Sequence, residues 1–198
     1  MRTLKRVWTV IVPVKPVDVG KSRLGAEPGL VRAIALDTID AALAAHRVSR
    51  VLVVTADRTL ATAAEIVAEA APRGLRAAIS AGLVAAADDS PRAVLLGDLP
   101  ALRPEDLDEA LHRAEAVPTS FVADREGTGT TLVTARAGIE LRHAFGPDSA
   151  RRHRELALAQ LVLPAGSTVP LDVDTPEQLA ATSGLGWRTA AQSAVSAA

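Results

Sequence analysis

The stretch Ala93-Val94-Leu95-Leu96-Gly97-Asp98-Leu99-Pro100 decides how the rest of the chain is interpreted. A short apolar run that ends in turn residues is typical of a buried β-strand. Gly97 permits a tight turn or the close approach of another segment, and Pro100 cannot continue a strand ladder. Asp98 is therefore expected where a central strand ends, which is the edge where open α/β sheets bind ligands. A carboxylate there can hold a divalent cation, and capping of the following turn is an equally good interpretation.

The composition describes a globular chain. Its 198 residues, 48% of them hydrophobic, are enough for one domain with a full core. The net charge of -1 argues against a nucleic acid or a membrane surface as the main partner. The absence of cysteine excludes disulfides and thiolate metal sites. The N-terminal apolar run is too short for a membrane-spanning helix and has no cleavage site, so we expect a cytoplasmic protein.

Apolar runs alternate with helical patterns along the chain. We expect strands at 7–14, 51–54, 93–96, 120–123 and 132–135, a weaker strand at 161–163, and helices at 30–46, 75–87, 104–116 and 150–159. Another helix is expected after Thr175, with Pro176 in its first turn and Gln178 as the capping-box partner. Because strands alternate with helices up to Pro118, the pattern predicts an α/β fold with a parallel sheet. We expect a single domain over residues 1–186 and a loosely ordered tail at 187–198.

The segment 58–71 supports two interpretations. Its many Ala and Glu residues favour one helix. Alternatively, residues 65–69 form a short strand that is followed by a loop at 71–74. The pattern alone leaves both open.

Basic residues gather after the first expected strand. Lys15, Lys21 and Arg23 can meet an anionic ligand at the strand end, although a solvated loop is an equally common arrangement. Gly20-Lys21-Ser22 is similar to the end of a Walker A loop. That pattern requires a Gly where this chain has Lys15, so a true P-loop is not expected.

A second acidic segment, Asp172-Val173-Asp174, precedes the Thr175 helix. In an extended segment the two carboxylates face opposite ways, so one can join Asp98 while the other faces the helix. Two carboxylates about 4 Å apart repel by about 4 kcal/mol at an effective dielectric constant of about 20. Mg²⁺ between them would reverse that sign. The alternative is that both residues only favour the N-terminus of the helix.

Two further segments offer hydrogen-bond donors. Gly146-Pro147-Asp148-Ser149 opens the helix at 150–159 and can bind phosphate, or Asp148 or Ser149 can simply cap it. The turn 127–131 is rich in Gly and Thr. The four His residues lack metal-binding spacing. The absence of G-x-G-x-x-G after the first strand argues against a dinucleotide-dependent dehydrogenase.

These blocks together resemble the CofC/FbiD family of guanylyltransferases, which serve the biosynthesis of coenzyme F-420. The resemblance covers nearly the whole chain in order. It rests on Val14-Lys15 with Lys21-Ser22-Arg23-Leu24, on Gly97-Asp98-Leu99-Pro100-Ala101-Leu102, on Phe121-Val122-Ala123-Asp124-Arg125 with Gly127-Thr128-Gly129-Thr130, on Phe145-Gly146-Pro147-Asp148-Ser149 with Arg152-His153, and on Asp172-Val173-Asp174-Thr175-Pro176.

The resemblance implies a GT-A-like nucleotidyltransferase fold, a Rossmann-like three-layer sandwich with a mostly parallel sheet. It implies transfer of GMP from GTP to the phosphate of a three-carbon phospho-acid, with release of pyrophosphate. That acid is phosphoenolpyruvate in actinobacterial-looking members and 2-phospho-L-lactate in archaeal relatives. The unstable product passes to the next transferase, which implies a transient protein partner.

The resemblance also assigns roles to individual residues. Asp98 and Asp172 would hold Mg²⁺ and would be catalytic together with Lys21. The acceptor acid would be bound by Thr130, Gly146 and Ser149. The GTP phosphates would be bound by Lys15, Lys21 and Arg23.

Two features depart from the family pattern. The helix after Thr55 looks shortened, so that 65–69 would be the third strand against its helical propensity. Arg76 stands where members usually have Asn, beside the nucleotide. The alternatives are 2-phospho-L-lactate or 3-phosphoglycerate as acceptor, a same-fold enzyme for a sugar phosphate or molybdopterin, and a nucleotide-binding relative without activity.

Overall fold

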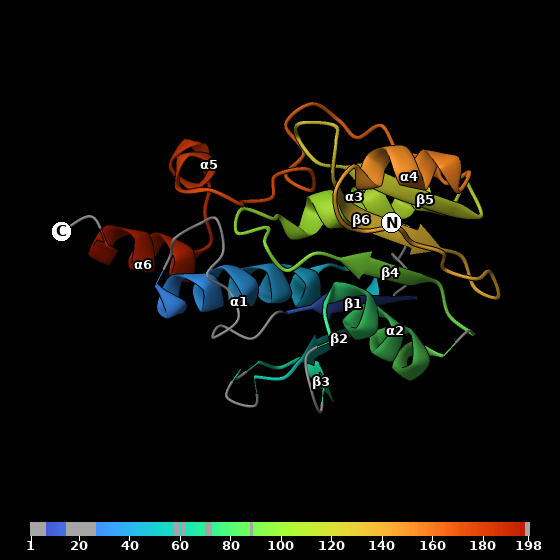
Figure 1. The fold of residues 1–198 in the computed structure, drawn as a ribbon, viewed down its shortest axis with the longest axis horizontal. Coiled ribbons are helices and arrows are strands. Elements are labelled where there is room, and N and C mark those ends of the chain that lie inside the picture. The colour runs from blue at the N-terminus through green and yellow to red at the C-terminus, as the bar shows by residue number, and fades with distance from the viewer. Residues whose placement is uncertain are drawn as a thin grey trace.

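A computed structural model of the chain describes residues 7–14, 27–57, 60, 62–69, 73–87 and 89–196 (Figure 1). The described strands form one seven-stranded sheet in the order β3-β2-β1-β4-β6-β5-β7. They are β1 (Trp8–Pro13), β2 (Val48–Thr55), β3 (Glu65–Ala68), β4 (Arg92–Leu95), β5 (Thr119–Ala123), β6 (Thr130–Ala135) and β7 (Ala159–Gln160). The helices are α1 (Pro28–Ala44), α2 (Leu75–Ala86), α3 (Pro104–Ala114), α4 (Ser149–Glu155), α5 (Pro176–Ala181) and α6 (Trp187–Ser196).

The sheet is the middle of three layers. One buried cluster joins one sheet face to α1 and α3, and a second joins the other face to α2 (Figure 1). Side chains alternate along β1, so that Val10 and Val12 lie in the first cluster and Ile11 in the second. Gly82 of α2 leaves no room for a Cβ above Ile11, which keeps this helix close to β1. The predicted α/β sandwich is confirmed.

Strand direction sets which residues share an edge. All neighbouring strands pair in parallel except at β6, which runs antiparallel to both β4 and β5. The sheet is therefore mostly parallel, as predicted. Since β6 reverses, β4 and β5 end at the same edge of the sheet, and β6 begins there.

The structure resolves the two interpretations of 58–71 for its described part. Residues Glu65–Ala68 form β3, which pairs in parallel with β2 at the edge of the sheet. The Arg50 guanidinium reaches the Glu65 carboxylate at 3.0 Å. Pairing with β2 overrides the helical propensity of this segment, so the strand interpretation is confirmed.

The elements after residue 149 differ from their predicted bounds. Helix α4 ends at Glu155, short of the predicted 159, and Ala157 then takes a left-handed φ of 61°. The last strand is Ala159–Gln160, upstream of the predicted 161–163, because these residues pair with Ser120 and Phe121 of β5. The capping box at Thr175 and Gln178 of α5 is confirmed.

The expectation of a loose tail is wrong for residues 187–196, which form helix α6 against α1 (Figure 1). The buried Asp37 carboxylate of α1 accepts the Thr189 N–H at 2.8 Å. Arg188 donates to the Asp40 carboxylate at 2.6 Å. The helix is thus anchored by polar groups distant in sequence, which an apolar pattern does not reveal. None of the described helices is long and apolar enough to cross a bilayer.

Candidate active site

The edge where β4 and β5 end collects several of the predicted residues. Asp98 follows β4, Asp124 follows β5, and Thr130 begins β6. A Cβ on Gly97 would lie 3.3 Å from the Pro13 carbonyl oxygen. The predicted close approach at Gly97 is therefore real, and it lets the end of β1 pack beside the Asp98 turn.

The segment Asp172-Val173-Asp174 is joined to Asp98 through the backbone. The Val173 N–H donates to the Asp98 carbonyl oxygen at 3.0 Å. The Val173 side chain is buried with Leu30 and Ile34 of α1 and with Leu179. Asp174 lies on the α5 side, where its N–H donates to the Gln178 Oε1 atom at 2.7 Å.

The Asp172 carboxyl is strongly perturbed by its surroundings. Burial, together with the negative charges of Asp98, Asp124, Asp174 and Glu126, raises the pKa of Asp172 to about 8. Its Oδ1 atom is buried and has no hydrogen-bond partner among the described residues. A buried carboxylate among other carboxylates is stable as an anion only beside a cation.

Three acidic side chains form a possible cation site, and the sequence analysis missed two of them. Carboxylate oxygens of Asp124, Glu126 and Asp172 lie within 4.8 Å of one another. Hard oxygen ligands of this kind suit a divalent cation. Asp124 stood within a block that carries the family resemblance, but no role was assigned to it. Only the reversed direction of β6 shows that Asp124 shares an edge with Asp98.

Asp124 also shapes the turn before β6. Its two carboxylate oxygens accept the Thr128 N–H at 2.9 Å and the Gly129 N–H at 2.7 Å. A Cβ on Gly129 would collide with this carboxylate. Glu126, on the same turn, accepts a hydrogen bond from the Gln178 Nε2 atom at 3.1 Å. The turn and the start of α5 are thereby held together.

Thr130 is held by a buried histidine. The His153 Nε2 atom accepts the Ala144 N–H at 2.8 Å, so the ring proton of the neutral form lies on Nδ1. That proton is donated to the Thr130 Oγ1 atom, 2.9 Å away. Burial, together with the nearby His143 and Arg152, lowers the pKa of His153 to about 4. The ring is therefore neutral at physiological pH.

Gly146 and Ser149 lie beside this histidine. Gly146 has a φ of 120°, which strongly favours glycine. Ser149 is buried at the start of α4, and the Ala150 N–H donates to the Thr128 carbonyl oxygen at 3.0 Å. No side chain caps α4, so the simple capping role considered for this segment is not observed. The structure therefore brings Thr130, Gly146 and Ser149 to one region.

The structure does not describe the basic loop that was predicted to meet the GTP phosphates. Lys15, Lys21 and Arg23 lie outside the described residues. Arg76 is exposed on the first turn of α2. Burial lowers the pKa of His143, and the positive charge of Arg76 lowers it further, so these two side chains are electrostatic neighbours.

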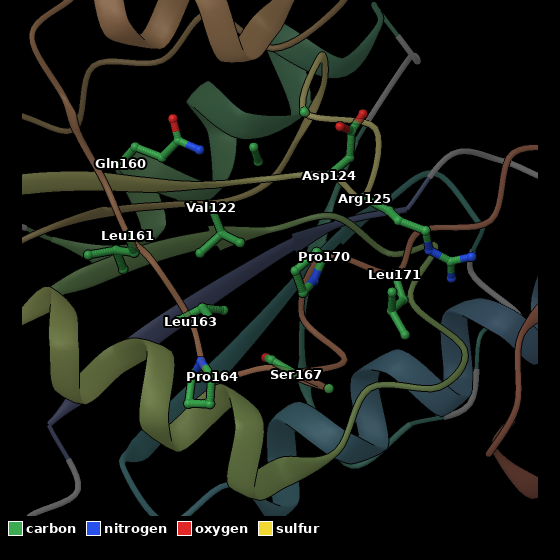
Figure 2. Close-up of a pocket in the computed structure, with 13 residues that line it drawn as sticks. Val122, Asp124, Arg125, Gln160, Leu161, Leu163, Pro164, Ser167, Pro170 and Leu171 are labelled. Carbon is green, nitrogen blue, oxygen red and sulfur yellow. The ribbon is translucent and has the colours of Figure 1, made fainter.

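A pocket of about 350 Å³ adjoins the acidic cluster (Figure 2). Asp124 and Arg125 lie at one end of it, and Leu161 and Leu163 at the other (Figure 2). Leu171, the residue before Asp172, also lines it. The pocket is thus a mostly apolar neighbour of the charged site.

Solved structures with the same fold define the class of protein. A putative nucleotide-diphospho-sugar transferase from Desulfovibrio desulfuricans G20 has a TM-score of 0.60 at 20% identity, covering 85% of this chain and 82% of its own. A CMP:2-keto-3-deoxy-manno-octonic acid synthetase complexed with CTP has a TM-score of 0.58 at 14% identity, covering 96% and 98%. A Mycobacterium tuberculosis protein in complex with manganese has a TM-score of 0.59 at 18% identity, covering 89% and 97%. The fold is that of the nucleotidyltransferases.

The family is defined more narrowly by sequence. Residues 8–183 match the family described as "Guanylyl transferase CofC like". A phosphoenolpyruvate guanylyltransferase of Streptomyces scabiei (strain 87.22) is 45% identical, covering 94% of this chain and 96% of the relative. The corresponding enzyme of Thermomonospora curvata is 39% identical, covering 94% and 89%. This chain belongs to the CofC-like guanylyl transferase family and is a nucleotidyltransferase, as the resemblance implied.

Proposed function

We propose that this chain transfers GMP from GTP to the phosphate of phosphoenolpyruvate in the cytoplasm and releases pyrophosphate. The names of relatives 39–45% identical over most of the chain support this acceptor. The observation that carries the reaction is the buried Asp172 carboxyl, which lacks a hydrogen-bond partner at Oδ1 and lies among other acids. Nucleotidyl transfer brings two polyanions together, and a site of this kind can hold the cation that the reaction requires.

We propose Mg²⁺ as that cation, with Asp98 and Asp172 as its ligands and Asp124 and Glu126 beside them. Carboxylate oxygens of Asp124, Glu126 and Asp172 lie within 4.8 Å of one another and suit a hard cation, and the buried Asp172 Oδ1 atom has no partner among the described residues. Asp98 is not part of that group, and its assignment as a ligand is supported by its negative charge, which helps to raise the pKa of Asp172. When bound, the ion would neutralise charge on the reacting phosphates. The manganese complex of a structural neighbour is consistent with divalent metal use.

The reaction requires alignment more than proton transfer. An oxygen of the acceptor phosphate attacks the α-phosphorus of GTP in line, a new P–O bond forms, and the bond to pyrophosphate breaks. The attacking oxygen is already anionic, so no strong general base is needed. The chain contributes positioning and charge complementarity. We assign contacts with the GTP phosphates to Lys15, Lys21 and Arg23, and stabilisation of the leaving pyrophosphate to Lys21.

The acceptor acid is assigned to Thr130, Gly146 and Ser149. Because His153 donates its Nδ1 proton to the Thr130 Oγ1 atom, the hydroxyl proton of Thr130 remains available. That proton can be donated to an anionic oxygen of the acid. Product transfer to the next transferase remains an expectation about a transient partner.

The test is pyrophosphate release from GTP and Mg²⁺, with phosphoenolpyruvate, 2-phospho-L-lactate and 3-phosphoglycerate offered separately. Mass spectrometry would identify each product. Release with phosphoenolpyruvate alone is expected. Release with another acid would contradict phosphoenolpyruvate as the acceptor but would support the guanylyl transfer itself. Measurable GTP binding without release under any acid would indicate a nucleotide-binding relative without activity.

A further inference from the structure

Two buried nitrogens of the half-buried Arg152 side chain lie beside Gly146 without a hydrogen-bond partner among the described residues. The Nε and Nη2 atoms of Arg152 are shielded from solvent, and neither has a hydrogen-bond acceptor among the described residues. A Cβ on Gly146 would lie 3.1 Å from Nη2, so this edge of the guanidinium packs directly against the glycine. Buried charges are normally paired or bind a ligand, since an unpaired charge loses its hydration without compensation.

The exposed neighbour of Arg152 on the same helix behaves differently. Arg151 forms an ion pair with Glu155 one turn along α4, and both side chains are largely exposed. Arg152 is instead half-buried, and its charge acts on the buried His153. The unpaired state is therefore specific to Arg152 and is not a general property of this basic helix.

The surroundings of Arg152 are basic. The pKa of His153 is lowered by burial, by His143 and by Arg152, and that of His143 is lowered by burial and by Arg76. No carboxylate contributes to either shift. The His143 Nδ1 atom is also buried without a partner among the described residues. The unpartnered Nε and Nη2 atoms of Arg152 therefore offer donors for an anion, and among the described residues no carboxylate accepts from them.

The geometry of the unpartnered Nε and Nη2 atoms indicates the kind of anion. The Nε and Nη2 hydrogens of a guanidinium point in parallel, and together they match the two oxygens of a carboxylate. A phospho-acid carries two anionic ends. In the proposed reaction the phosphate of the acceptor acid reacts near Asp98 and Asp172. The carboxylate at the other end of the acid is therefore the group that can reach the basic region around Arg152. Thr130 connects the two regions, because it follows the Asp124 turn and contacts His153.

We propose that Arg152 binds the carboxylate of the acceptor acid and selects acceptors that carry one. This inference rests on the proposed function for the identity of the acid. It adds a residue to the three already assigned to the acceptor. It also explains why Gly146 has no side chain, since a Cβ would press against the guanidinium edge.

The test measures equilibrium binding by titration calorimetry in MgCl₂, and so does not depend on turnover. Phosphoenolpyruvate is compared with ethyl phosphate, which has the phosphate but no carboxylate, and GTP is titrated separately. The variants are Arg152→Gln, Arg152→Lys and the matched control Arg151→Gln. Arg152→Gln is expected to weaken phosphoenolpyruvate about 10- to 100-fold, the usual effect of a lost charged hydrogen bond.

The same variant should leave ethyl phosphate and GTP within about twofold of the wild type, given the factor-of-two scatter typical of such contacts. Arg152→Lys should restore only part of the affinity, because an ammonium cannot form the two-pronged contact. The proposal is overturned if phosphoenolpyruvate binding is unchanged, if GTP or ethyl phosphate weakens equally, or if Arg151→Gln has the same effect. A wild-type chain that binds phosphoenolpyruvate without transferring GMP would refute the proposed function and leave this inference intact.

The melting temperatures of the variants show whether a loss of binding comes from a loss of folding. Removal of an unpaired buried charge should not lower the stability of the free chain. An Arg152→Gln variant that melts at or above the wild-type temperature and still binds phosphoenolpyruvate normally would overturn the proposal.

Discussion

His153 has no exposed surface, and both of its ring nitrogens are hydrogen-bonded in the folded chain. Its pKa falls from the ordinary value of 6.5 to about 4. In the unfolded chain the ring takes up a proton near pH 6.5, whereas the folded chain resists protonation until about pH 4. Its contribution to stability is therefore fully present above pH 6.5 and is lost as the pH falls towards 4.

We expect the His153 ring to account for a loss of about 2 kcal/mol of unfolding free energy between pH 7 and pH 5. Urea denaturation at the two pH values measures it. His153→Gln should flatten the pH dependence by that amount, whereas replacement of the exposed His112 by Gln should not. An equally steep dependence in His153→Gln would contradict the assignment.

Two adjacent threonines allow a second test at this scale. Thr130 and Thr131 are both buried, but only the Thr130 hydroxyl is bonded, whereas that of Thr131 has no partner among the described residues. Thr130→Val should cost about 1–3 kcal/mol, because it leaves the His153 Nδ1 proton unsatisfied. Thr131→Val should cost nothing or should stabilise the chain. Thermal or urea unfolding of the two variants compares them directly, and equal losses would contradict the expectation.

At the scale of elements, helix α6 depends on a single buried carboxylate. Asp37 accepts the Thr189 N–H, and a Cβ on Gly186 would collide with it. Asp37→Ala should cost about 1–3 kcal/mol, because it leaves helix N–H groups unsatisfied, and it should increase hydrogen exchange in 187–196. Asp40→Ala removes only a partly exposed partner of Arg188 and should cost less than about 1 kcal/mol. Protection of α6 that survives Asp37→Ala would show that apolar packing holds the helix.

The elements also show what the sequence could and could not reveal. Strands β1, β2 and β4 were readable because they are buried on both faces and have continuous apolar runs. Strand β3 is a short, exposed edge strand within a segment rich in Ala and Glu, so its pairing with β2 is what decides between the two interpretations. Helix α6 was missed because a polar contact with Asp37, distant in sequence, anchors it.

The same reasoning applies to the candidate site. Asp98 follows a predicted strand and Asp172 precedes a predicted helix, so both were identified from the sequence. In the structure the Val173 N–H donates to the Asp98 carbonyl oxygen, and the charge of Asp98 acts on Asp172. Asp124 and Glu126 come close to Asp172 because β6 runs antiparallel between β4 and β5. Strand order and direction arise from long-range pairing, so a motif-by-motif reading could not place these two residues at that edge.

At the scale of the whole molecule, the acidic cluster couples cation binding to stability. Burial and the negative charges of the neighbouring carboxylates make the ionised form of Asp172 unfavourable when no cation is bound. Millimolar Mg²⁺ or Mn²⁺ should therefore raise the melting temperature, because a ligand that binds only the folded state stabilises it. EDTA should reverse this increase.

Asp172→Asn tests the origin of that effect. The variant should melt higher than the wild type without metal, should lose the cation-dependent increase, and should lose about 100-fold or more of any turnover, as expected for loss of a metal ligand. The exposed Glu140→Gln serves as the matched control and should change none of these. A full cation response in Asp172→Asn would exclude this carboxylate as a ligand.

The late position of Asp172 in the chain has a consequence for synthesis on the ribosome. A nascent chain that has emerged only as far as β7 already contains every described strand, together with Asp98, Asp124 and Thr130. It still lacks Asp172, and it lacks the Val173 and Leu179 side chains that pack on Leu30 and Ile34 of α1. The sheet can therefore form during translation while the acidic cluster stays incomplete. With Asp172 as the proposed ligand, cation binding, and with it nucleotide chemistry, would be withheld until the segment leading into α5 has left the exit tunnel.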